Sequence, residues 1–96
     1  MKDTYIYPAV FDYSDGAGVS IIFPDLPGCL PCADNTEGAV KNAKEAMMLH
    51  LYGMEKDNEV TPKPSAITKI DVKEKQTIFL VDAYMPPFRE KMKKNM

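Results

Sequence analysis

The stretch that most constrains the fold is "FPDLPGCLPC", residues 23–32, which holds three of the eight prolines and both cysteines. Pro24 ends the strand predicted before it. Leu26 precedes a proline and is therefore restricted to extended conformations. Pro27 has a fixed negative φ and Gly28 can adopt a positive one, which suits the two central positions of a type II turn. We therefore predict a corner between two strands. Its structural residues are Pro24, Pro27, Gly28 and Cys29.

Cys29 and Cys32 have the spacing of a C-x-x-C motif, but their surroundings do not favour its chemistry. A redox thiolate needs a helix N-terminus or a nearby cation. Here Pro31 lies inside the pair, the predicted helix begins later, and no basic residue lies between positions 2 and 41. Zinc needs four ligands, and His50 is the only other soft or imidazole candidate, unless a dimer shares the site. We interpret the cysteines as small hydrophobic residues and expect no metal or cofactor. Cys32 and His50 have no assigned role.

Composition places the chain among single-domain globular proteins. It has 96 residues, of which 45% are hydrophobic and 27% charged, which is ordinary for a folded domain. No apolar run is long enough for a membrane span or a signal peptide, so we expect a cytoplasmic protein without membrane contact. The net charge is −2, which does not favour nucleic-acid binding by the whole molecule. Residues 89–96 carry four basic side chains and one acidic one, so this tail is basic and residues 1–88 are acidic.

Alternating aromatic and β-branched residues predict two antiparallel strands over 5–13 and 18–23, joined by "SDGAG". Pro8 lies inside the first strand, so its missing N–H must face outward or sit at a bulge. A short third strand is expected near 29–33. The stretch 76–84, "QTIFLVDAY", predicts a last strand buried on both faces. The segment 66–75 is ambiguous.

A helix is predicted between the third and last strands. Asp34 or Asn35 can cap its start, and Asp34 with Glu37 has the spacing of a capping box. Its expected apolar stripe consists of Val40, Ala43, Met47, Leu51 and Met54. The predicted fold class is therefore α+β: an antiparallel sheet in the order β-β-β-α-β, covered by one main helix.

Several segments carry a family likeness. "YPAVF", "GVSIIFPDLPGC", "EGAVKNAKEAM", "PKPS" and "VDAYMPPFREK" follow one another over about residues 5–91. Together they resemble the antitoxin HicB of the HicA–HicB toxin–antitoxin systems. The resemblance implies a partial RNase H-like fold and the neutralisation of HicA, an mRNA-cleaving toxin shaped like a double-stranded-RNA-binding domain. Cys29 matches the family's "PGC" position, whereas Cys32 replaces a commoner small or polar residue.

The resemblance also predicts how the chain is organised. Family members usually continue into a ribbon-helix-helix or helix-turn-helix domain that binds operator DNA, and this sequence stops at Met96. We therefore expect residues 1–88 to form the HicB-like antitoxin domain. Residues 89–96 would be a basic tail or the start of a linker to an absent DNA-binding domain, through which alone DNA would be bound.

The leading hypothesis is a non-enzymatic inhibitor that occludes the active site of a HicA-type toxin. Its acidic body would steer the encounter with a basic toxin. Exposed acids near the hairpin and the corner are the candidate toxin contacts. They are Asp12, Asp15 and Asp25. An open sheet edge also predicts a homodimer or higher homo-oligomer.

Two alternatives belong to other classes. A metal-dependent RNase H-like nuclease would need carboxylates that converge on cations. The available acids are Asp12, Asp25, Glu45 and Asp82. A solitary ligand-binding or assembly domain could use the aromatic stripe of the first strand, although such a stripe is more often core. The stripe comprises Tyr5, Tyr7, Phe11 and Tyr13.

Overall fold

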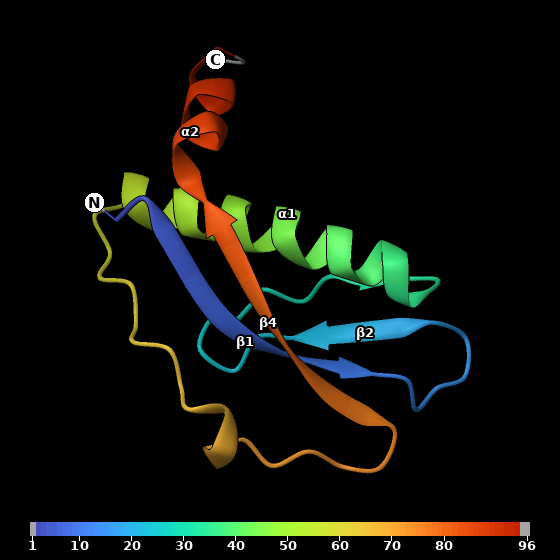
Figure 1. Ribbon diagram of the computed structural model, residues 1–96. Helices are drawn as coiled ribbons and strands as arrows, with labels where there is room; N and C mark the ends of the chain where they lie inside the picture. The colour runs from blue at the N-terminus through green and yellow to red at the C-terminus, as the bar shows by residue number, and fades with distance from the viewer. Residues whose placement is uncertain (1, 95–96) are drawn as a thin grey trace.

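A computed structural model describes residues 2–94 as an antiparallel sheet with a long helix across one face (Figure 1). This confirms the predicted α+β class. The strands lie in the order β3-β2-β1-β4. The elements are β1 (Thr4–Asp12), β2 (Val19–Ile22), β3 (Cys32–Ala33), α1 (Thr36–Lys56), a 3₁₀ turn (Ile67–Lys69), β4 (Gln76–Tyr84) and α2 (Met85–Lys94).

The ladder between β1 and β4 is the longest in the sheet and explains how Pro8 is tolerated. Its register places Pro8 opposite Leu80. At one end Met85 N–H donates to Asp3 O, and at the other Tyr13 N–H donates to Lys75 O. Hydrogen-bonded pairs alternate along an antiparallel ladder, so the bonds of β1 to β4 lie at its odd-numbered residues. Pro8 occupies a non-hydrogen-bonded pair, and its missing N–H removes no bond to β4.

The core lies between the sheet and α1. Alternate residues of β1 point into it, together with one stripe of α1 and residues of the corner. The helix residues of this stripe are Ala39, Ala43, Met47 and Leu51. The sequence prediction was wrong about Val40, which is 46% exposed. Ala39 takes its place at the start of the stripe, while every other predicted member is buried or packs against the core. Asn35 is the N-cap, and its side chain accepts from Gly38 N–H at 2.8 Å.

The prediction that the last strand is buried on both faces was wrong. Val81 and Ala83 are buried, whereas Leu80 is 59% and Tyr84 61% exposed. α1 covers one face of the sheet, and β4 is the outer strand. The apolar residues of β4 that point away from α1 therefore stay in contact with solvent.

A second helix, α2, follows β4 directly and was not predicted. The "MPPF" segment was expected to end the strand, and β4 does end at Tyr84. Pro86 and Pro87, however, lie in the first turn of a helix, where no intrahelical N–H bond is required. The expected division after residue 88 falls inside this helix. Among residues 2–94, no helix is long and apolar enough to span a membrane.

Candidate interaction surface

The ion pairs of Arg89 hold α2 against the rest of the molecule. Its Nε donates to Glu55 Oε1 at 3.0 Å and its Nη2 to Glu55 Oε2 at 2.8 Å. Its Nη1 donates to Asp3 Oδ1 at 2.9 Å. Tyr5 Oη also donates to Glu55 Oε2, at 3.2 Å. This two-pronged geometry fixes both distance and orientation, so one arginine joins α2 to the end of α1 and to the N-terminal segment.

The electrostatics of this cluster favour the charged pair. The Arg89 hydrogen bonds hold the pKa of Glu55 below its ordinary value, although partial burial acts in the opposite direction. The same bonds raise the pKa of Arg89. Burial raises the pKa of the Tyr5 phenol, and the neighbouring Glu55 charge adds to the rise. Tyr5 therefore stays a neutral donor while Glu55 stays an anionic acceptor.

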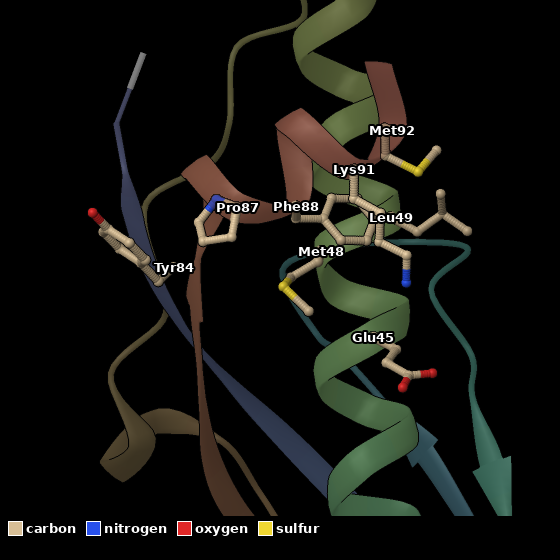
Figure 2. A pocket seen from close by; sticks show the side chains of 8 residues that line it. All are labelled: Glu45, Met48, Leu49, Tyr84, Pro87, Phe88, Lys91 and Met92. Carbon is tan, nitrogen blue, oxygen red and sulfur yellow. The ribbon is translucent and has the colours of Figure 1, made fainter. Parts of the chain in front are cut away.

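α2, held in this way, forms an open groove of about 520 Å³ with α1 and the end of β4 (Figure 2). Its lining is mostly apolar, and its two charged side chains, Glu45 and Lys91, have opposite signs. The lining residues are Glu45, Met48, Leu49, Tyr84, Pro87, Phe88, Lys91 and Met92. Phe88 also packs edge-on against Tyr52 of α1, with 6.0 Å between the ring centroids. We call this feature the α1–α2 groove.

Leu49 is the centre of a wider apolar surface. It is 55% exposed and lines the α1–α2 groove as well as a second hollow between α1 and the corner. That second hollow includes Leu30, which is 67% exposed, and half-buried His50. Contiguous exposed apolar surface with a polar rim is typical of a protein-binding site. The outer side of α1 is therefore the candidate interaction surface.

The corner has the geometry of a closed turn. Cys29 N–H donates to Leu26 O at 3.1 Å across Pro27 and Gly28, and Gly28 has a φ of 89°. Pro24 directly follows Phe23, whose carbonyl oxygen accepts from Leu26 N–H. The Cys29 thiol is buried, and burial raises its pKa. Cys32 is exposed, and both thiols are free.

The three acids predicted as partner contacts lie outside the α1–α2 groove. Asp12 accepts from Ser14 N–H at 2.7 Å and from Gln76 Nε2 at 2.8 Å. Hydrogen bonds from Ser14 and then Gln76 lower the pKa of Asp12 to about 2. Asp15 accepts from Ala17 N–H at 3.0 Å. Each of these carboxylates stabilises the hairpin connection, and a contact of either with a partner stays a prediction.

Asp25 has a comparable internal role. Its two carboxylate oxygens accept from Ser65 N–H at 2.9 Å and from Ser65 Oγ at 2.5 Å. Tyr7 Oη donates to Pro62 O at 2.6 Å in the same connection. Asp25 and Tyr7 therefore fasten the segment between α1 and β4 to the corner and the sheet.

The acids considered for a nuclease have separate partners. Asp82 pairs with Lys44 at 3.5 Å, and Glu45 lines the α1–α2 groove. Asp12 and Asp25 bond to Gln76 and Ser65, as described above. Within residues 2–94, no group of three or more histidine, cysteine or acidic residues could hold a metal ion.

Sequence reasoning missed the groove because it did not predict α2. Phe88 and Met92 are four residues apart, and Met85 precedes Phe88 by three, which is the spacing of an apolar helix face. This pattern indicates a helix, but two adjacent prolines at its start are more typical of a segment that ends regular structure. The wide separation of Glu55 and Arg89 along the chain offers no comparable local signal.

Comparison with known proteins identifies related families and folds. The family model described as "HicB_like antitoxin of bacterial toxin-antitoxin system" matches residues 7–94. An uncharacterised 14.9 kDa protein from the rep–hol intergenic region of Haemophilus phage HP1 (strain HP1c1) is 41% identical over 63 residues. This match covers 65% of the present chain and 46% of the phage protein. The chain thus spans about half the length of that relative.

Solved structures share the fold. A chain of a HicA3–HicB3 toxin–antitoxin complex matches with a TM-score of 0.67 and 26% identity, covering 82% of this chain and 98% of that one. A chain of a toxin–antitoxin complex from Streptococcus pneumoniae gives 0.73 and 19%, covering 97% and 88%. The N-terminal domain of the Burkholderia pseudomallei antitoxin HicB gives 0.68 and 23%, covering 80% and 95%. At their lower identities, the last two matches support the fold alone.

Proposed function

Because the chain belongs to the HicB-like antitoxin family of bacterial toxin–antitoxin systems, we propose that it binds a HicA-type toxin and neutralises it by covering its active site. The observation that carries this proposal is the family match over residues 7–94. The structural match to a chain of a HicA3–HicB3 complex supports it. Inhibition by occlusion needs binding without catalysis, so the chain would act as a regulator rather than an enzyme.

The outer side of α1 is the surface that we propose for the toxin. Leu49, Met48 and Phe88 offer exposed or half-buried apolar side chains around a groove. Methionine side chains adapt to an apolar partner surface. Glu45 and Lys91 place charges of opposite sign in the groove lining and would orient a partner that carries the complementary pair. The acidic body of residues 1–88 would steer a basic toxin toward this surface.

The expected organisation of the whole system follows from the family. Toxin binding would occur in the cytoplasm, where an mRNA-cleaving toxin acts. Operator DNA would be bound by a segment that follows α2, and copies of the chain would associate as homodimers or higher oligomers. Asp12, Asp15 and Asp25 would then act as secondary contacts in addition to their internal hydrogen bonds.

The direct test is an RNA-cleavage assay with the protein of the adjacent reading frame, mixed with increasing amounts of this chain. We expect cleavage to stop near equimolar chain. Leu49→Asp should weaken inhibition at least about tenfold, because it places a charge at the centre of an apolar interface. Val60→Asp is the matched control, since Val60 is 90% exposed and lies outside the α1–α2 groove.

The assay tests the antitoxin function and the proposed docking surface separately. Unchanged RNA cleavage at a large excess of folded chain would overturn the proposed function. Full inhibition by Leu49→Asp would leave the antitoxin function standing and exclude the outer side of α1 as the docking surface.

A further inference from the structure

β4 is the outermost strand of the sheet, and its free edge is long. It runs for nine residues, all of which are in register with β1. Within residues 2–94 no strand pairs with its other side. An open edge of this length is a template for pairing with another strand. The opposite border is different, because β3 contains only Cys32 and Ala33.

The ladder to β1 determines which backbone groups of β4 are free. The terminal bonds from Met85 N–H to Asp3 O and from Tyr13 N–H to Lys75 O fix the alternation along the ladder. Odd-numbered residues of β4 therefore bond to β1. The N–H and C=O groups of Ile78, Leu80 and Asp82 point to the outer edge, where they can bond to a second strand.

We propose that two copies of the chain pair antiparallel through β4, with Leu80 opposite Leu80 of the second copy. This arrangement places a hydrogen-bonded pair at the two-fold axis and joins two four-stranded sheets into one. The side chain of Leu80, which is 59% exposed, would be covered at the centre of the interface. The inference concerns self-association and does not depend on toxin binding.

The register with Leu80 on the axis keeps like charges apart. With Leu80 on the axis, Ile78 lies opposite Asp82, Phe79 opposite Val81, and Gln76 opposite Tyr84. Asp82 is the only charged residue of β4, and here it never faces its own copy. A register centred on Asp82 would place two like charges directly opposite each other, which destabilises a strand pair. A register centred on Ile78 would leave the C-terminal end of β4 without a partner strand.

One side chain contact competes with this pairing at modest cost. Lys44 Nζ lies 3.5 Å from Asp82 Oδ1, and the two side chains are 48% and 65% exposed. Solvent-exposed pairs of this kind contribute little to stability, because water and salt screen them.

The two-fold axis of the proposed dimer would be perpendicular to the sheet, so α1 of both copies would lie on the same face of the joined sheet.

The first test is the mass of the chain in solution, measured by sedimentation at several concentrations. We expect a concentration-dependent dimer. Leu80→Lys should raise the dimer dissociation constant at least about tenfold, because it sets two like charges on the axis. Ile22→Lys is the matched control: Ile22 is 43% exposed on the same sheet face, but β2 lies inside the sheet. Circular dichroism would establish that both variants fold.

The second test measures hydrogen exchange of the backbone amides at the outer edge of β4. The amides of Ile78, Leu80 and Asp82 should be protected in concentrated solution and should exchange rapidly on dilution. A chain that stays monomeric up to about 1 mM would overturn the proposal. A dimer in which these three amides exchange freely, or one that Ile22→Lys disrupts as strongly as Leu80→Lys, would also overturn it.

Discussion

Arg89 of α2 and Glu55 of α1 form a two-pronged ion pair, with nitrogen–oxygen distances of 2.8 and 3.0 Å. Their side chains are only 12% and 7% exposed. Because α2 supplies half of the α1–α2 groove, this pair connects the stability of the fold to the shape of the proposed toxin surface.

Replacing Arg89 by methionine should lower the free energy of unfolding by about 3 kcal/mol, because the nearly buried Glu55 carboxylate would lose its cation. Urea unfolding would measure the change. Lys93→Met is the control, since Lys93 is exposed on the same helix and should have an effect below about 0.5 kcal/mol. Equal effects of the two substitutions would contradict the structural role given to Arg89.

The same pair predicts how stability depends on pH. The pKa of Glu55 lies below its ordinary value of 4.5 in the folded chain, since Arg89 stabilises the anion. Its contribution is therefore complete above pH 4.5 and is lost as the pH falls through the lowered pKa. Glu55→Gln should be less stable than the parent at pH 7, and the difference should shrink on acidification. Urea titrations at a series of pH values would measure it, and a constant difference would argue against the pair.

Two glycines predict opposite effects of the same substitution. A Cβ at Gly18 would lie 2.6 Å from Ala33 O, so Gly18→Ala must displace β3 and should cost about 1–3 kcal/mol. A Cβ at Gly53 would meet nothing within 4 Å, and this residue lies inside α1. Gly53→Ala should therefore stabilise the chain by about 0.5–1 kcal/mol. Thermal unfolding of both variants would check the signs.

The two cysteines should differ in reactivity. Cys32 is exposed, whereas Cys29 is buried in the core, where burial raises the pKa of its thiol. A thiol reagent should modify Cys32 rapidly in the folded chain and reach Cys29 only after unfolding. Cys32→Ser would then show no fast phase. Rapid modification of both thiols in the native chain would contradict the closed corner around Cys29.

Local backbone chemistry explains which parts of the fold could be predicted from the sequence. The ring of Pro27 fixes its φ, and Gly28 has no Cβ to hinder the positive φ that it adopts, so the corner could be predicted from local chemistry. The apolar stripe of α1 could be predicted except at its first position, because only packing on the sheet decides that Ala39 rather than Val40 is buried.

Long-range contacts explain what the sequence could not show. α2 is held by Arg89, whose partners Asp3 and Glu55 are far away along the chain. The sequence predicts only that Asp12, Asp15 and Asp25 are exposed acids. Their internal hydrogen bonds depend on the folded hairpin and on the connection between α1 and β4.

Asp25 allows a partner contact to be separated from a structural role. Its carboxylate bonds to Ser65, and Ser65→Ala would remove the hydroxyl bond while keeping the Asp25 charge. Asp25→Asn would remove the charge and keep an oxygen that can accept from Ser65 N–H. If the Asp25 charge contacts a basic toxin, Asp25→Asn should slow association and make the association rate less dependent on salt. Ser65→Ala should leave the association rate near that of the parent. Stopped-flow mixing with the toxin at two salt concentrations would measure both rates. Equal association rates for the parent and Asp25→Asn would show that Asp25 only holds the connection between α1 and β4 in place and does not contact the toxin.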